Sequence, residues 1–152
     1  HASSAASDVY KRQGTDIEFR GEFVDFDPLT CTPRPKQEKI PILVGGDTPA
    51  AIRRAAKLAD GYYPGTGDFA ELQKLIADVR QAAEDNDRDP AEIEINAHFS
   101  VFGEGDRIEG VEKMREAGVG RIMVPGFIFG GPSGMEQLQE FGESVVEKTK
   151  AN

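Results

Sequence analysis

The chain has 152 residues, of which 38% are hydrophobic and 30% are charged, and its formal net charge is −9 at pH 7. This composition is typical of one globular domain, or part of one, and excludes a disordered or low-complexity chain. The negative charge disfavours nucleic acids and anionic membranes as partners. No stretch approaches the roughly 20 apolar residues of a membrane-spanning helix.

The chain contains one cysteine, Cys31. An internal disulfide framework and a cysteine-based metal site are therefore not expected, and a reducing, cytoplasmic location is the default. Cys31 has no base close to it in the sequence, so we regard it as an incidental residue. The sequence also lacks metal-ligand spacings, a serine-nucleophile elbow and a phosphate-binding Walker loop.

The first 38 residues divide into two segments. Residues 1–13 are small and polar without periodicity, and we expect a non-native or disordered leader that takes no part in the fold. In residues 14–38, aromatic residues alternate with polar ones, which predicts a short hairpin or extended arm, broken at Asp27-Pro28. The prolines around Arg34 keep the end of this segment extended.

A strand is predicted over Ile40–Val44, which is short, apolar and rich in β-branched residues. It ends at Gly45-Gly46, and Thr48 then caps a helix that begins at Pro49 and runs to Ala59. The first N–H groups of such a helix attract anions, and glycine allows a phosphate to approach the backbone closely. Taken alone, however, two glycines after a strand are also consistent with an ordinary turn.

A second strand, Gly61–Tyr63, is followed by a turn over Pro64–Gly67. Asp68 then caps a helix that continues to about Asp85, and Glu71 completes a capping-box pattern. The apolar stripe of this helix consists of Phe69, Leu72, Ile76, Val79 and Ala83.

Residues alternate between apolar and polar over Glu92–Phe102, which predicts a third strand. Asp106 caps the next helix, which Gly118 closes. Arg121–Val124 is the fourth predicted strand, and it is followed by a glycine-rich loop over Pro125–Gly134. A final helix carries Met135, Leu138, Phe141, Val145 and Val146.

The chain therefore reads as four strand–helix units, which imply parallel strands paired in sequential order with the helices on one face. A complete (β/α)8 barrel needs about 250 residues, so four units amount to half of one. A complete small doubly wound domain is the alternative. The four units are Lys39–Ala59, Asp60–Asp85, Glu92–Ala117 and Gly120–Lys150.

The run from Pro33 to Pro64 resembles the luciferase-like monooxygenase family. The resemblance rests on a Pro-x-Pro lead, a strand that ends in Gly45-Gly46, an Arg-Arg-Ala-Ala helix from Arg53, and an Asp-Gly-aromatic strand from Asp60. It implies an α/β fold in which residues 39–152 form the C-terminal half of a (β/α)8 TIM barrel, preceded by an extended arm.

The same resemblance implies an oxidoreductase that uses flavin mononucleotide (FMN) or the 8-hydroxy-5-deazaflavin coenzyme on a small organic substrate. In the family, positions that match Gly45, Gly46, Thr66 and Gly67 hold the cofactor phosphate. Asp47 stands where many relatives have a small or neutral residue, so its charge opposes tight phosphate binding unless the side chain points away or caps the helix.

The resemblance names no catalytic residue in this chain, because the family's catalytic and ring-contacting residues lie mainly in the first half of the barrel. His98 and Phe127 follow or end predicted strands, so we consider both as candidates for the substrate pocket. A histidine that only satisfies its neighbours on a polar barrel interior is the alternative for His98.

Two other functions fit the sequence. The first is a barrel isomerase or lyase that uses the Gly45-Gly46 turn for a substrate phosphate. The second is a non-catalytic βα fragment that acts in assembly. Because half a barrel leaves strand edges and an interior face uncovered, we expect the chain by itself to be marginal, dimeric or aggregating. Its expected partner is another copy or the missing N-terminal half.

Overall fold

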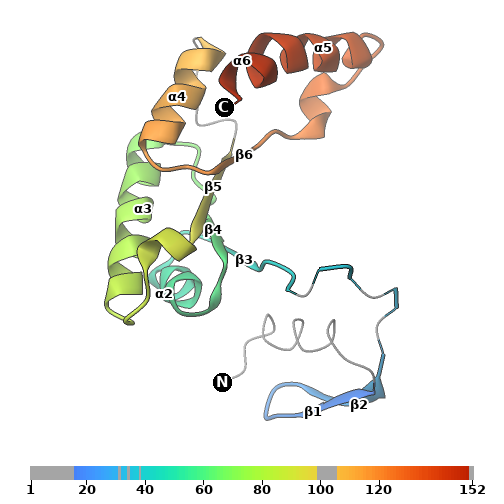
Figure 1. Cartoon of the computed structure of the whole chain (residues 1–152), viewed down its shortest axis with the longest axis vertical. Helices are drawn as coiled ribbons and strands as arrows, with labels where there is room; N and C mark the ends of the chain where they lie inside the picture. The colour runs from blue at the N-terminus through green and yellow to red at the C-terminus, as the bar shows by residue number, and fades with distance from the viewer. Residues whose placement is uncertain (1–15, 31, 34, 38, 99–105, 151–152) are drawn as a thin grey trace. The chain divides into compact units, whose positions relative to one another are not determined.

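The computed structural model describes residues 16–30, 32–33, 35–37, 39–98 and 106–150 (Figure 1). The expected leader over residues 1–13, Cys31, and the expected strand end beyond His98 lie outside these residues. The chain divides into two compact units, His1–Ile42 and Leu43–Asn152. In the described part of the chain, every helix is too short or too polar to cross a membrane.

The first unit contains an antiparallel hairpin of β1 (Ile17–Arg20) and β2 (Asp25–Leu29). Phe19 and Phe26 face each other across it, with ring centroids 6.0 Å apart. The hairpin prediction is confirmed. Asp27 and Pro28 lie within β2, but the register shifts between the Phe19–Phe26 and Ile17–Leu29 pairs, so the predicted break is an irregularity in the strand rather than its end. A two-stranded hairpin leaves one side of each strand unpaired, so it tolerates a proline that lacks an N–H.

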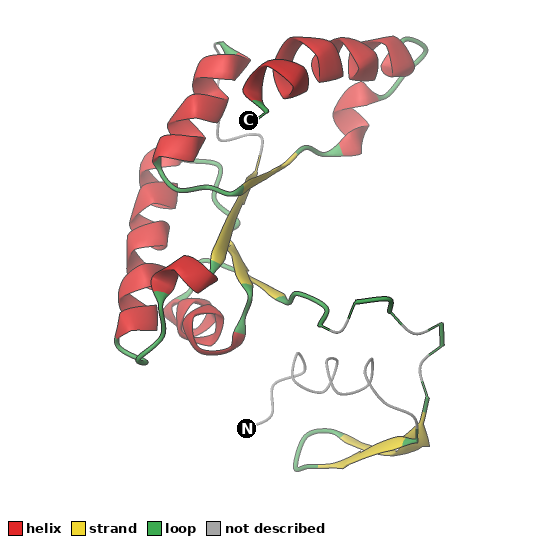
Figure 2. Cartoon of the chain, viewed as in Figure 1, coloured by secondary structure: helices red, strands yellow, loops and turns green. Residues whose placement is uncertain are grey.

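The second unit contains a parallel sheet with the strand order β3-β4-β5-β6, as the sequence predicts. Helices α2, α3 and α4 all lie on one side of it (Figure 2). The strands are β3 (Leu43–Gly45), β4 (Gly61–Tyr63), β5 (Glu94–His98) and β6 (Arg121–Met123), and the helices are α2 (Pro49–Leu58), α3 (Phe69–Glu84) and α4 (Arg107–Glu116).

Two strands begin later than predicted. The strand predicted over Ile40–Val44 begins only at Leu43, since Pro41 has no N–H to donate to a neighbouring strand. The strand predicted from Glu92 begins at Glu94, because Asp89 caps a 3₁₀ turn, η1 (Pro90–Glu92), by accepting a hydrogen bond from the backbone of Ala91.

The C-terminal segment begins after β6. The predicted loop over Pro125–Gly134 in fact contains a 3₁₀ turn, η3 (Gly126–Phe129), and its last residue already belongs to α5. The final helix is continuous and contains a π-helical segment. Its parts are α5 (Gly134–Phe141), η4 (Gly142–Val146) and α6 (Glu147–Thr149).

The core lies between the sheet and α2, α3 and α4. Tyr62, Ile95 and Ala97 point from the strands towards the helices, and each is at most 3% exposed. Side chains alternate along a strand, so Tyr63, Asn96 and His98 face the other way. The helices supply most of the remaining core residues, which are Ile52, Ala55, Ala56, Leu72, Leu75, Ile76, Val79, Ala83 and Met114.

The predicted helix caps are confirmed. The Thr48 hydroxyl accepts the backbone N–H of Ala51 at 3.3 Å, and the Asp68 carboxylate accepts that of Glu71 at 2.8 Å. The Asp106 carboxylate accepts the N–H of Ile108 at 2.8 Å. These bonds satisfy N–H groups that have no partner inside the helix, and they set where each βα loop ends.

Gly61 is required where β4 packs between its neighbours. A Cβ atom there would lie 3.0 Å from the Glu94 carbonyl oxygen and 3.2 Å from Leu43 Cγ. We expect Gly61→Ala to lower the free energy of unfolding by about 1–3 kcal/mol, measured by urea denaturation. Gly142→Ala is the matched control, because no atom lies within 4 Å of its Cβ position, and it should lose nothing. Equal losses in both variants would contradict this packing.

Candidate functional site

Two loops meet at the C-terminal ends of β3 and β4, where barrel enzymes carry their chemistry. One follows Gly45 and leads into α2, and the other follows Tyr63 and leads into α3. Gly46 has φ of 108°, a left-handed conformation that favours glycine. Of the predicted phosphate residues, Gly45 therefore ends β3 and Gly46 begins the turn. A larger residue at Gly46 would strain the backbone.

Both peptide groups of Gly46 are held by the adjacent tyrosines of β4. Its N–H donates to the Tyr63 carbonyl oxygen at 3.2 Å, and its carbonyl oxygen accepts the Tyr62 hydroxyl at 2.9 Å. Tyr62 is fully buried. Burial, together with the nearby charges of Asp47 and Asp78, raises the pKa of Tyr62 to about 12, so its hydroxyl remains a donor.

Asp47 joins the two loops. Its carboxylate accepts the N–H of Gly65 at 2.6 Å, while Thr48 rather than Asp47 caps α2. A charge-assisted bond of this kind is stronger than a neutral one. Asp47 therefore fixes the spacing between the loops, but it also places a negative charge beside the start of α2.

Thr66 is buried and lies in a short chain of hydrogen bonds. Its hydroxyl donates to the Glu71 carboxylate at 2.6 Å and accepts the N–H of Asp68 at 3.1 Å. In the predicted capping box, Glu71 would reach the Asp68 N–H directly; here Thr66 lies between them. The Thr66 hydroxyl proton is therefore used within the loop, and neighbouring Gly67 is exposed.

The start of α2 is where this site can bind an anion. Gly46 and Ala51 donate their N–H groups inside the chain, and Pro49 has none, which leaves the N–H groups of Asp47 and Ala50 without an acceptor among the described residues. Unpaired N–H groups and the helix dipole together favour negative charge. The arrangement combines two backbone N–H donors with one nearby carboxylate, that of Asp47.

Tyr63 and His98 form a second polar group at the same ends of the strands. The Tyr63 hydroxyl lies 2.8 Å from His98 Nδ1, and the ring centroids are 4.5 Å apart. We did not predict a role for Tyr63 from the sequence. The available signal was that Tyr63 and His98 lie near the ends of neighbouring parallel strands, on the side away from the helices.

Phe127 is not brought next to His98. It lies on η3 and is 83% exposed, whereas Phe129 packs edge-on against Phe141 at 5.5 Å. An apolar groove of about 590 Å³ runs beside these two rings, and Val124, Met135, Leu138 and Val146 also line it.

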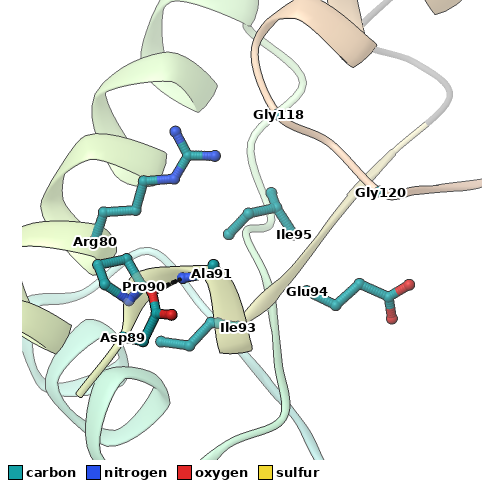
Figure 3. Close-up of a pocket in the computed structure, with 9 residues that line it drawn as sticks. All are labelled: Arg80, Asp89, Pro90, Ala91, Ile93, Glu94, Ile95, Gly118 and Gly120. Atoms are coloured by element: carbon teal, nitrogen blue, oxygen red, sulfur yellow. Dashed lines mark hydrogen bonds between the residues drawn. The ribbon is translucent and has the colours of Figure 1, made fainter.

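A polar pocket of about 440 Å³ lies at the opposite, N-terminal ends of β5 and β6 (Figure 3). Arg80 reaches from α3 towards Gly118, and Asp89 and Glu94 line the same pocket. Residues at this end of a barrel usually serve stability. Among the residues that the structure describes, no three His, Cys, Asp or Glu side chains are grouped to hold a metal ion.

The model of a family described as luciferase-like monooxygenase matches residues 8–143. An uncharacterised protein of Mycobacterium tuberculosis is 37% identical over 145 residues, which cover 89% of this chain and 48% of that protein. The chain thus spans about half the length of the curated relative that it matches.

Two further matches have lower identity. The F420-dependent glucose-6-phosphate dehydrogenase of Nakamurella multipartita is 29% identical over 104 residues, 67% of this chain and 30% of that protein. The structure of coenzyme F420 dependent tetrahydromethanopterin reductase from Methanopyrus kandleri matches with a TM-score of 0.72 and 15% identity, over 96% of this chain and 62% of that one. At this identity, the structural match shows the fold alone.

The role of Tyr62 predicts a pH effect on stability. Its pKa is raised from 10.0 to about 12, so the stability due to its protonated form is complete below pH 10 and is lost as the pH rises through about 12. At pH 8, Tyr62→Phe should lower the free energy of unfolding by about 1 kcal/mol through the lost hydrogen bond.

Denaturant unfolding at several pH values measures this effect. Between pH 10 and 12, the native protein should lose more stability than Tyr62→Phe, so the difference between the two narrows. A difference that stays constant over this range would show that the Tyr62 hydroxyl is not held as described.

Proposed function

Because this chain belongs to the luciferase-like monooxygenase family, we propose that it is the C-terminal half of a (β/α)8-barrel oxidoreductase that uses FMN or the 8-hydroxy-5-deazaflavin coenzyme. Its four parallel strands and its coverage of 48% of a relative's length support the assignment to half a barrel. Family membership also disfavours the alternative of a sugar-phosphate isomerase or lyase.

The observation that carries the proposal is the Gly46 turn at the start of α2. The residues present fit a phosphate, since the turn has little side-chain bulk and opens a helix of 10 residues. The N–H groups of Asp47 and Ala50 are the proposed donors. Gly45 and Gly46 contribute space and backbone conformation, because the Gly46 N–H is already bonded to Tyr63.

Thr66 and Gly67 complete the proposed site from the second loop. The Thr66 hydroxyl is proposed to order this loop through Glu71 rather than to bind phosphate itself. The exposed backbone at Gly67 then lies beside the cofactor. The bound cofactor would supply the redox chemistry, and this chain supplies binding and orientation.

Several features of the whole protein remain part of the proposal. The names of the F420-dependent relatives support a deazaflavin, whereas the family description supports a monooxygenase that uses flavin. His98 is proposed to line the substrate pocket. Phe127 is proposed to line it in the complete protein, where other segments of the chain would cover this exposed ring. The edge strands β3 and β6 support pairing with a preceding half or with a second copy, and a cytoplasmic location is consistent with these partners.

Comparison of FMN with riboflavin tests the phosphate site, because riboflavin has the same ring without the phosphate. The test protein is the product of the complete reading frame that contains this chain, and flavin fluorescence measures binding. Gly46→Val should weaken FMN binding about tenfold or more, through the loss of one or two charge-assisted bonds. Riboflavin binding should change little. The same titration with the deazaflavin coenzyme decides between the two cofactors.

Arg54→Ala is the matched control, since Arg54 lies on the exposed face of α2. It should leave both affinities unchanged. If Gly46→Val keeps the preference for FMN over riboflavin, the glycines form only a turn and the phosphate assignment is wrong.

Asp47 provides a test in the opposite direction. Asp47→Asn keeps an oxygen that can accept the Gly65 N–H, but it removes a negative charge next to the proposed phosphate. We expect FMN to bind several-fold more tightly and riboflavin to bind unchanged, with the gain smaller at high salt. Unchanged FMN affinity at low salt would place the phosphate away from this loop.

A further inference from the structure

Tyr63 and His98 are connected across two neighbouring strands. Each lies at the last residue of its strand, and their polar atoms are 2.8 Å apart. Their side chains point away from the helices, since Tyr62 and Ala97, which alternate with them, are in the core. The pair therefore lies on the interior side of the half barrel, at the same end of the strands as the Gly46 turn.

The Tyr63 hydroxyl is proposed to be the donor in this hydrogen bond. Burial raises the pKa of Tyr63 above its ordinary value, which keeps the hydroxyl protonated. The hydroxyl can therefore donate to His98 Nδ1, which lies 2.8 Å away. A neutral histidine that accepts at Nδ1 carries its proton on Nε2.

The residues below the pair on β5 show that this face is built from polar groups. Asn96 is fully buried, and its Nδ2 donates to the Glu94 carbonyl oxygen, but its Oδ1 has no partner among the residues that the structure describes. Glu94 in turn forms an ion pair with Arg121 of β6 at 3.2 Å. Barrel interiors are usually filled by branched apolar side chains, so this polar column is unusual.

A buried polar atom without a partner is costly, by about 1–3 kcal/mol, and such groups persist mainly where function needs them. Within the described residues, the column of Glu94, Asn96 and His98 reaches the C-terminal ends of the strands. Its last member, His98, is only half-buried, so it can meet a ligand there.

We propose that Tyr63 is a positioning residue that fixes His98 with its proton on Nε2, so that His98 offers a neutral N–H donor to a carbonyl or carboxylate oxygen of the substrate. The proposed tautomer depends only on residues of this chain. The proposal that the bound oxygen belongs to a substrate depends on the proposed function. A neutral N–H donor suits a carbonyl oxygen in particular, because that hydrogen bond buries no net charge.

Nitrogen-15 NMR of the imidazole rings tests the tautomer in this chain. The chain has two histidines, His1 and His98, so their signals separate easily, and a His98→Gln variant assigns them. We expect His98 to be protonated at Nε2 and not at Nδ1. Tyr63→Phe should produce a mixture of tautomers, while Tyr62→Phe, on the opposite face of the same strand, should leave the tautomer unchanged. A proton on Nδ1, or no effect of Tyr63→Phe, would overturn the proposal.

Acetate is the probe for the oxygen ligand, used with the complete FMN-loaded protein at constant ionic strength. A saturable shift of the His98 Nε2 signal is expected, with at least fivefold weaker binding in Tyr63→Phe. No saturable shift, or equal affinity in both proteins, would contradict the ligand assignment.

FMN affinity, measured on the same samples, separates the two proposals. Tyr63→Phe should keep the preference for FMN over riboflavin because the contact with Gly46 uses the Tyr63 backbone. If the preference is absent even in the native protein, the proposed function fails while the tautomer result still stands.

Discussion

The arrangement of the site depends on one residue, Gly46, whose two peptide groups are held by two consecutive residues of β4. Tyr62 faces the helices and holds the Gly46 carbonyl oxygen through its hydroxyl, while Tyr63 faces the interior and accepts the Gly46 N–H at its backbone. Because β3 and β4 have only three residues each, these bonds extend their pairing beyond the strands themselves. The same two residues thus connect the helix-packed core, the Gly46 turn and the histidine on the interior face.

The charge of Asp47 has two opposite effects at the site: it orders the two loops and it disfavours an anion. Asp47 holds Gly65 and so fixes the distance between the loops, yet its charge opposes the helix dipole of α2. No lysine or arginine forms an ion pair with Asp47 among the described residues, and Arg53 and Arg54 are exposed on α2. Specificity for a phosphate at this site would therefore come from backbone N–H groups and shape rather than from side-chain charge.

Sequence patterns predicted the local features well. The caps at Thr48 and Asp68 and the order of four parallel strands follow from residue type and periodicity. Contacts between residues far apart in the sequence were missed. The pairing of Tyr63 with His98 and the bonds from Arg88 to the carbonyl oxygens of α2 depend on tertiary packing. The strand start at Leu43 was missed because Pro41 cannot donate to a neighbouring strand, and the start at Glu94 because Asp89 caps a 3₁₀ turn over Pro90–Glu92.

A crystal structure of the complete protein with FMN tests the central claim most directly. The account predicts the flavin phosphate at the start of α2, within hydrogen-bond distance of the N–H groups of Asp47 and Ala50. The N–H and the carbonyl oxygen of Gly46 should still be bonded to Tyr63 and Tyr62. A phosphate bound elsewhere, or a Gly46 turn that rearranges to bind it, would contradict the account.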